Sequence, residues 1–455
     1  MDWIQIWMKR TTRLLAVSLC SLSLAHAAAE DFPRPPELQP NIAFWTKVYG
    51  EWTTNQIALT DTEDLSMVYT VIDVPSPGTR QNGLTRDQII SRSKDAVKVA
   101  LYELEHDQIH SDLAREIAFR LKDNNRPDKY RRIDSIRAQN GLRDRFEAGY
   151  RLSGAHDKEM RARLRLNGLP EELIAIVFVE SLFYQSSMSH VGAAGLWQFM
   201  RGTAKEYMRI NPLVDERYDP VIATDAAIEY LKRAKERLYA WPIAITSYNY
   251  GRAGMQRAME QVGSHDLVDV LKGYNTSRFG FAARNYYAEF IAALDVYQNA
   301  SQYFPDVNPV QHWAYDVVEL PNPLFANDIA GSDADWFRQY NPALTVAARV
   351  GKEVIPSGYT IRVPESEKDR VNRRIASISP RERERAASQL RARHRANGRQ
   401  RLLDIVKAYD VFYEQLAKRL GYALNEKPKK GSIILVRSAD SRFTEVPRPI
   451  AKTPE

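Results

Sequence analysis

The sequence predicts a mainly α protein that ends in two small units of mixed α+β structure. From Arg86 to Asn299, charged residues are interleaved with apolar residues three or four positions apart, which is the spacing of amphipathic helices. From His312 to Pro364, short strand-like runs surround one helical stretch, and Arg391 to Arg437 has a strand-helix-helix-strand (βααβ) pattern. At about 100 to 200 residues per domain, a chain of 455 residues has room for several domains.

The composition is that of a folded protein, because 44% of the residues are hydrophobic and 27% are charged. No run of about 18 or more apolar residues offers a membrane span. The net charge of +7 suits a polyanionic partner such as nucleic acid, anionic lipid or an acidic wall polymer, but an ordinary solvated surface explains it equally well. Charge alone therefore identifies no partner.

Residues 1–27 have the layout of a secretory signal peptide. Three basic residues, Lys9, Arg10 and Arg13, precede an apolar run from Leu14 to Leu24, and small residues follow up to Ala27. The apolar run is about half of the ~20 residues that cross a bilayer, so a membrane anchor is the weaker alternative. We expect cleavage after Ala27 and export of the chain.

Cys20 is the only cysteine and lies inside the predicted signal peptide. Cleavage leaves a chain without thiols, which suits an oxidising compartment and excludes a cysteine nucleophile, a cysteine zinc site and a disulfide framework. Lipidation of Cys20 is an alternative, but Leu19 is bulkier than bacterial lipoprotein signals usually tolerate.

Residues 28–139 are expected to form an N-terminal lead, a hairpin and a helical segment. Several prolines lie between Pro33 and Pro40, and alternating apolar residues from Gln56 to Val74 are typical of a β-hairpin. Apolar residues at helical spacing follow: Leu113, Ile117, Leu121, Ile133, Leu142 and Phe146.

A helix is predicted to begin at Pro170 and to carry Glu180. Proline is accepted in a first helical turn, and Glu171 and Glu172 behind it suit a helix N-terminus. By helical spacing the neighbours of Glu180 are apolar or aromatic: Leu173, Ile176, Val177, Phe183 and Tyr184. Burial there raises the pKa of a carboxyl group and keeps it protonated, as a general acid requires. The structural alternative is a glutamate that bonds a helix end or pairs with an arginine.

A second carboxylate does not accompany Glu180 in the sequence, because the next acidic residue is Glu206. Ordinary glycosidases use two carboxylates, whereas one is sufficient if the substrate supplies the nucleophile. Asp219 or Asp225 could still be brought to Glu180 by folding.

Three further segments combine polar groups with aromatic residues: Gly192–Met200, Ile245–Gly251 and Phe279–Tyr287. Amides and phenols at the rim of an apolar cleft suit N-acetylated sugars. Each segment taken singly is more often core or helix capping. Together, Glu180-Ser181, Gly195-Leu-Trp-Gln198, Ser247-Tyr-Asn249 and Asn285-Tyr286 resemble, in order and spacing, the four motifs of the soluble-lytic-transglycosylase-like catalytic domain. The sequence around these motifs is most similar to that of the membrane-bound lytic murein transglycosylases. The resemblance predicts a catalytic domain at residues 140–300.

The resemblance implies a helical, lysozyme-like domain that cleaves the bond from N-acetylmuramic acid (MurNAc) to N-acetylglucosamine (GlcNAc) in peptidoglycan without water. Glu180 would be the sole acid and base, and a 1,6-anhydro ring would close on the muramic acid. Neither a metal nor a cofactor is implied. The resemblance also implies roles for five other residues. Ser181 would help to orient Glu180, Gln198 and Asn249 would form hydrogen bonds with the sugars, and Tyr248 would line the cleft. Tyr286 would form a hydrogen bond near Glu180 or with the acetamido group. The adjacent Tyr287 is the alternative to Tyr286, and Trp197 and Ser247 stand where many relatives have methionine and alanine.

Residues 391–437 are similar to a LysM module, a βααβ fold that binds GlcNAc runs in peptidoglycan and chitin. Residues 312–364 would be a divergent copy of this module. Residues 365–390 are expected to form a charged linker or a long solvated helix, and residues 438–455 are expected to form a tail. The usual Gly-Asp-Thr-Leu opening reads Gly398-Arg-Gln-Arg-Leu402, which puts helix capping and glycan binding in doubt.

The residues and the resemblance together therefore favour an exported lytic transglycosylase that acts on peptidoglycan strands in the periplasm and associates with the cell wall or outer membrane. Two rivals stay open: a peptidoglycan muramidase, which would need a second carboxylate, and a non-catalytic wall-binding protein. Nucleic acid is not an expected partner, since the basic residues are mostly interspersed with acidic ones. The sequence identifies no protein partner.

Overall fold

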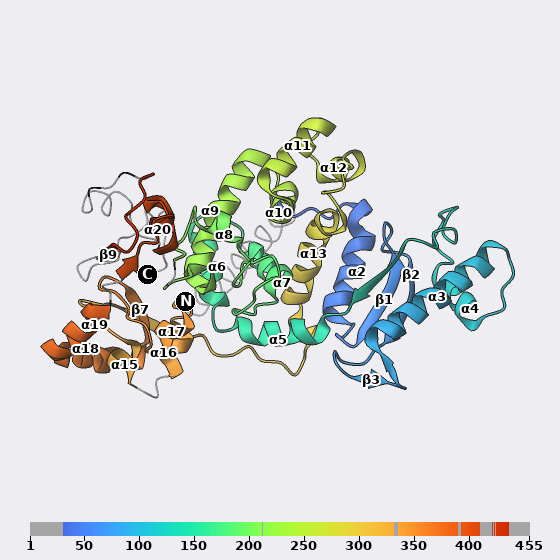
Figure 1. Cartoon of the computed structure of the whole chain (residues 1–455). Helices are drawn as coiled ribbons and strands as arrows, with labels where there is room; N and C mark the ends of the chain where they lie inside the picture. Colours follow the sequence, from blue (N-terminus) through green and yellow to red (C-terminus); the bar gives the residue numbers. More distant parts are fainter. Residues whose placement is uncertain are drawn as a thin grey trace, which may run out of the picture. The chain divides into compact units, whose positions relative to one another are not determined.

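Figure 1 shows the computed structural model of the protein, which describes residues 31–211, 213–331, 335–389, 393–409, 421, 423 and 425–435. The predicted signal peptide with Cys20, the predicted tail and part of the unit at 391–437 lie outside the described residues. The described part of the chain is mainly helical with few, short strands, so the predicted mainly α class is confirmed. The described part of the chain divides into two compact units, one within residues 1–154, 164–183 and 230–310, and the other within residues 155–163, 184–229 and 311–455.

A three-stranded antiparallel sheet lies in the first unit. Strand β1 (Gln56–Asp61) pairs with β2 (Val68–Asp73), which confirms the predicted hairpin, and its other edge pairs with β5 (Ile136–Asn140). Helices α3 (Arg86–Glu105) and α4 (Asp112–Arg120) pack on β2 (Figure 1). The shared apolar core includes Ile57, Leu59, Tyr69, Leu101 and Ile117.

Strand β5 corrects the expectation of continuous helix after Arg86. Its residue Ala138 lies opposite Leu59 of β1 in the ladder. The apolar residues at 133, 142 and 146 have helical spacing, but a short stretch of them does not distinguish helix from strand. The open edge of β1 presents unpaired backbone groups, and pairing with β5 satisfies them.

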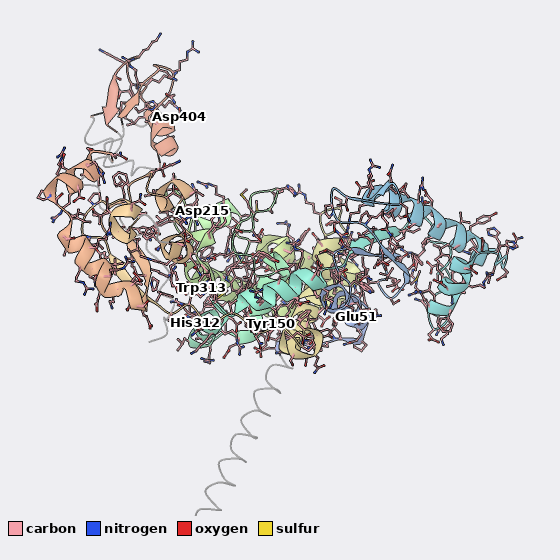
Figure 2. All side chains as sticks on the ribbon, turned by 90° about the horizontal axis from the view of Figure 1, so that it is seen from below. Glu51, Tyr150, Asp215, His312, Trp313 and Asp404 are labelled. Atoms are coloured by element: carbon pink, nitrogen blue, oxygen red, sulfur yellow. The ribbon has the colours of Figure 1, made fainter. Side chains whose placement is uncertain are left out.

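The long helix α13 (Phe281–Gln298) is the centre of the rest of the first unit, and most of its side chains are buried. It packs against α2 (Gln39–Gly50), α7 (Ala175–Ser181) and α10 (Trp241–Tyr250), and Figure 1 shows it between α7 and α2. Helix α5 (Arg143–Ser153), which carries the Tyr150 labelled in Figure 2, packs against α2. The other described elements of this unit are η1 (Pro36–Leu38), β3 (Arg80–Gln81), β4 (Leu84–Thr85), η2 (Glu171–Ile174), α11 (Arg252–Val262), α12 (Leu267–Gly273) and α14 (Ala300–Tyr303).

The second unit contains a small module at residues 315–364 that begins and ends with paired strands. Strand β6 (Tyr315–Glu319) is antiparallel to β7 (Thr360–Pro364). The chain between them forms three short helices where the sequence predicted one: α15 (Ala326–Ala330), α16 (Asp335–Tyr340) and α17 (Val346–Arg349). The other elements that begin in this unit before residue 311 are α6 (Asp157–Leu166), α8 (Arg201–Ala204), η3 (Glu216–Tyr218) and α9 (Pro220–Leu238).

The module is fixed to the earlier segments of its own unit by backbone and side-chain contacts. Val214 forms a bridge with Leu344 and joins the module's apolar core. The Asp215 amide donates to the Ala343 carbonyl at 2.7 Å. The imidazole of His156 meets the ring of Trp313 edge-on, with 5.0 Å between centroids; Asp215 and Trp313 are labelled in Figure 2.

The described residues 365–389 form two helices after a short 3₁₀ turn, not an exposed linker or one long solvated helix. Helix α18 (Lys368–Ser377) follows the short η4 (Glu365–Glu367) and precedes α19 (Pro380–Gln389). Val371 and Ile375 of α18, together with Ile378, are buried in the apolar core that β6 and β7 share. Their spacing of four and three residues was present in the sequence, but the many charged residues around them concealed it.

The described part of residues 391–437 begins and ends with paired strands. Strand β8 (Arg393–Arg395) is antiparallel to β9 (Ile433–Leu435), and α20 (Leu402–Tyr409), which carries the Asp404 labelled in Figure 2, lies between them in the chain. The second predicted helix, Phe412 to Leu420, lies outside the described residues. The assignment of this unit as a LysM module therefore stays a prediction.

Candidate active site

Glu180 lies near the end of a buried helix. After Pro170 the chain forms the 3₁₀ turn η2 and continues into α7, so helical structure begins where the proline predicted it. The first four residues of α7 are buried, whereas Glu180 itself is only partly buried. Leu182 ends the helix in a left-handed conformation with φ of 50°. The buried, apolar part of α7 thus holds the helix in the core, and the carboxyl group of Glu180 lies at the edge of that core.

A close backbone approach holds the end of α7 in place. A Cβ atom on Gly149 of α5 would lie 2.2 Å from the carbonyl oxygen of Leu182. Only glycine permits that approach, because any other residue would overlap with the backbone two positions after Glu180. The position of the Glu180 backbone therefore depends on Gly149.

Tyr286 of α13 is the hydrogen-bond partner of Glu180. Its hydroxyl group donates to Oε1 of Glu180 at 2.5 Å. Burial raises the pKa of Glu180 to about 7, and the bond from Tyr286 opposes that rise. The raised pKa is the direction that the apolar helix neighbours predicted. A carboxyl group with this pKa can give up and take back a proton at neutral pH.

The two adjacent tyrosines of α13 have different partners. Tyr287 donates its hydroxyl proton to the carbonyl oxygen of Pro33 at 2.9 Å, away from Glu180. The preceding Asn285 accepts a bond from Asn41 of α2 at 2.8 Å. The geometry therefore places Tyr286, not Tyr287, against the carboxyl group.

Helix α10 brings Tyr248 into the surroundings of Glu180. Burial raises the pKa of the Tyr248 phenol well above its ordinary value, and the charge of Glu180 adds to the effect. The ring of Tyr248 meets that of Tyr230 edge-on at 5.3 Å between centroids. Asn249, the next residue, is exposed. The structure thus brings Glu180, Tyr248 and Tyr286 together from three helices.

The two predicted serines are placed inside helices. Ser181 is buried and its Oγ donates to the Val177 carbonyl at 3.2 Å. Ser247 is also buried, with its Oγ donating to the Ala244 carbonyl at 2.6 Å. Both hydroxyl groups therefore satisfy helix carbonyls.

Gln198 belongs to the second unit, where its own loop fixes it. The side-chain amide donates to the carbonyl oxygens of Ser187 at 3.2 Å and Gly195 at 2.7 Å. The preceding Trp197 is fully buried and donates from Nε1 to Oγ1 of Thr224 at 2.9 Å. Trp197 is thus part of the core, and the sugar-binding role of Gln198 stays a prediction.

The two aspartates considered as a second carboxylate are bound by arginines. Asp219 forms an ion pair with Arg362; burial acts to raise its pKa, but Arg362 and backbone amides hold it below the ordinary value. Asp225 pairs with Arg163 at 2.8 Å. Both carboxylates therefore form ion pairs within the second unit.

Glu289 of α13 is a site residue that the sequence analysis missed. Burial, and after it the charge of Glu180, raise its pKa to about 8, while Arg137 opposes the rise. The available signal was its position three residues after Tyr286, which puts both side chains on one helix face. The surroundings of Glu180 thus contain a second carboxyl group.

The family of transglycosylase SLT domains matches residues 159–269. Over this range the chain is similar to transglycosylase SLT domains. The matched range contains Glu180, Gln198 and Asn249, whereas Tyr286 and Glu289 lie beyond its end.

Two relatives show how far the likeness extends. The chain is 23% identical over 244 residues to membrane-bound lytic murein transglycosylase D of Escherichia coli strain K12, which covers 49% of this chain and 51% of that protein. It is 34% identical over 114 residues to a putative tributyltin chloride resistance protein of Alteromonas sp. strain M-1, which covers 24% of this chain and 55% of that protein. The chain therefore spans about half the length of each relative.

Two solved structures have partial likeness to the protein. One is an inactive mutant of lytic transglycosylase Slt from Pseudomonas aeruginosa, with 16% identity, a TM-score of 0.29, and coverage of 60% of this chain and 46% of that chain. The other is the 70-kDa soluble lytic transglycosylase of Escherichia coli, with 16% identity, a TM-score of 0.25, and coverage of 49% and 31%.

Two features are absent from the described part of the chain. No described helix combines the length and the apolar character needed to cross a membrane. Within the same residues, no three or more acidic, histidine or cysteine side chains are grouped as metal ligands.

Proposed function

We propose that this protein is a lytic transglycosylase that cleaves the β-1,4 bond from MurNAc to GlcNAc in peptidoglycan and closes a 1,6-anhydro ring on the MurNAc. The observation that carries the proposal is the bond from Tyr286 to Glu180, whose pKa is raised to about 7. The SLT domain and the similarity to a lytic murein transglycosylase support the same activity.

The first step uses the protonated form of Glu180. Its proton passes to the glycosidic oxygen as the bond from C1 to that oxygen breaks, and GlcNAc leaves with the proton. Tyr286 stabilises the carboxylate that remains, because a hydrogen bond to the charged form favours it. Burial and the charge of Glu180 hold the pKa of Tyr286 well above its ordinary value, so the phenol keeps its own proton.

The second step uses the carboxylate form of Glu180. It removes the proton from the C6 hydroxyl group of the same MurNAc, and the C6 oxygen attacks C1. This step restores the protonated glutamate, so no water is consumed. Glu180 thus acts first as an acid and then as a base, for which a pKa near neutrality is suitable.

The remaining predicted site residues are proposed to bind the sugars. Gln198 and Asn249 supply amide groups that both donate and accept hydrogen bonds, as an acetamido group requires. Tyr248 lines the cleft, and Ser181 helps to orient the helix end that carries Glu180. The paired strands β6 with β7 and β8 with β9 support the proposal of two LysM-like wall-binding modules.

Export to the periplasm is proposed from the N-terminal sequence, with cell-wall or outer-membrane association through the modules or through Cys20. A muramidase is the second candidate, because Glu289 supplies a second carboxyl group from a part of the chain distant from Glu180. The two enzymes differ in whether water enters the product.

Digestion of purified murein sacculi tests the proposal. The mature protein should release muropeptides that end in 1,6-anhydro-MurNAc, about 18 Da lighter than hydrolysis products, and Glu180→Gln should release none. Products of hydrolytic mass would support the muramidase. Sacculi that bind the protein and stay intact would support the wall-binding alternative.

A further inference from the structure

Helices α15, α16 and α17 of the module at residues 315–364 line a pocket of about 110 Å³; the three helices are labelled in Figure 1. Its apolar wall includes Ala330, Phe337 and Val350, and two arginines, Arg338 and Arg349, also line it. Liquid water takes about 30 Å³ per molecule, so the pocket has room for one small group, such as a carboxylate with a neighbouring methyl group. None of the described lining residues carries a carboxyl group.

Arg349 has unused hydrogen-bonding capacity. A guanidinium group has five N–H donors, but among the described residues Arg349 makes one hydrogen bond, from Nη1 to the carbonyl oxygen of Arg338 at 3.3 Å. Its Nε is buried and has no acceptor in the same part of the chain. Burial and the charge of Arg338 both lower the pKa of Arg349. A buried donor without an acceptor costs free energy, so the pocket favours a ligand that accepts hydrogen bonds and is negatively charged.

The acidic residues on the neighbouring helices bind other arginines. Asp335 of α16 pairs with Arg338, and both side chains of this pair are exposed. Asp328 of α15 pairs with Arg385 of α19 at 3.1 Å. Within the residues that the structure describes, Arg349 is therefore a cation without a carboxylate partner.

A carboxylate fits these groups better than a neutral sugar does. A guanidinium can bind a carboxylate through two parallel N–H bonds, and the Nε edge of Arg349 becomes available after a small rotation of the side chain. Arg338 adds a second positive charge, and Phe337 offers an apolar contact for a methyl group. Asn327, which also lines the pocket and is exposed, has an amide that can bond a peptide group.

We propose that the pocket lined by α15, α16 and α17 binds the C-terminal carboxylate of a short peptide that ends in alanine, with Arg349 as the main contact and Arg338 as the second cation. The stem peptides of peptidoglycan end in D-alanine with a free carboxylate. The choice of this source rests on the proposed function, whereas carboxylate binding itself does not. The module would then hold the cell wall through its peptides.

Methyl NMR of the mature protein, labelled with ¹³C at alanine and valine methyl groups, tests the proposal. The probes are diacetyl-L-lysyl-D-alanyl-D-alanine, the same peptide with a carboxamide end, and acetate. The peptide should shift the signals of Ala326, Ala330 and Val350, which line the pocket. The carboxamide peptide should bind at least about tenfold more weakly, because it lacks the charge. Acetate should bind at least about tenfold more weakly, because it lacks the peptide group that Asn327 can bond.

Variants of the two arginines assign the contact. Arg349→Gln should weaken peptide binding about 10- to 100-fold, since a hydrogen bond to a charged group is lost. Arg349→Lys keeps the charge but not the paired donors and should recover only part of the affinity. Arg338→Gln, at an exposed position, gives a second variant and should weaken binding up to about fivefold. Arg370→Gln removes an exposed arginine of α18 that does not line the pocket, so this control should bind as the native protein does.

Equal affinity for the peptide and its carboxamide, equal affinity for acetate, or native affinity in Arg349→Gln would overturn the proposal. So would pocket signals that shift with chitotetraose and not with the peptide, because they would make the pocket a sugar site. The titration needs no cleavage. If sacculi yield no anhydro product, the proposed function fails while the peptide titration still decides the inference. If anhydro product forms and the peptide leaves the pocket signals unshifted, the inference alone fails.

Discussion

The hydroxyl group of Tyr286 donates a hydrogen bond to the carboxyl group of Glu180, and the two residues come from helices 106 positions apart in the sequence. Burial favours the protonated form of the glutamate. The tyrosine stabilises the carboxylate and so places the pKa of Glu180 where both protonation states are accessible.

Removing this bond should slow the reaction and move its pH profile. In Tyr286→Phe the carboxylate of Glu180 loses its donor, so the pKa of Glu180 rises above 7 and the alkaline limb of kcat moves to higher pH. A hydrogen bond to a charged group contributes about 1.5 to 3 kcal/mol, so we expect kcat at pH 6 to fall roughly 10- to 100-fold. Tyr287→Phe, which loses only the bond to Pro33, is the control and should keep the native profile. Equal losses in both variants would contradict the assignment of Tyr286.

Glu180 should lower the stability of the folded protein as the pH rises. Its folded-state pKa is about 7 against an ordinary value of 4.5, so the folded state binds more protons between these values and stability falls from about pH 4.5 to about pH 7. Glu180→Gln removes this loss. The variant should be more stable than the native protein at pH 8 by about 1 to 3 kcal/mol and equal to it at pH 4. Urea unfolding at both pH values measures the difference, and an equal gain at pH 4 would point to another cause.

The buried ion pair between Arg362 and Asp219 should be important for the second unit. Both side chains are largely buried, and removal of one partner leaves an uncompensated charge. We expect Arg362→Met to destabilise the second unit by about 3 to 5 kcal/mol. Lys272→Ala breaks an exposed ion pair with Glu37 and should leave the unfolding midpoint unchanged. Hydrogen exchange locates the effect. Amide exchange in β6 and β7 should become faster in Arg362→Met and should stay unchanged in Lys272→Ala.

Gly149→Ala should disturb the end of the helix that carries Glu180. The new methyl group would overlap with the carbonyl oxygen of Leu182, which forces a backbone shift costing about 1 to 3 kcal/mol. Activity should fall more than stability, because Glu180 is two residues away. Gly202→Ala is the control, since no atom lies within 4 Å of the added Cβ. A fully active Gly149→Ala protein would show that the position of Leu182 does not determine that of Glu180.

The sequence predicted the helical class, the hairpin and the helix after Pro170, because local spacing and proline position determine them. It did not predict β5, whose pairing with β1 depends on residues about 80 positions away. It also did not predict the burial of one face of α18, because the contact of Val371 and Ile375 with β6 and β7 is tertiary.

The site was predictable only in part for the same reason. Glu180 and its raised pKa followed from the apolar residues of its own helix. Glu289 did not, because its raised pKa results first from tertiary burial and then from the charge of a carboxyl group on another helix. Periodicity in the sequence shows which residues share one face of a helix. It does not show which other helix packs against that face.

Digestion of sacculi in oxygen-18-labelled water tests the central claim most directly. If Glu180 acts alone and the C6 hydroxyl group of MurNAc is the nucleophile, the released muropeptides should end in 1,6-anhydro-MurNAc and contain no oxygen-18. Muropeptides with a reducing end that carries oxygen-18 at C1 would show that water is the nucleophile and would contradict the single-carboxylate mechanism.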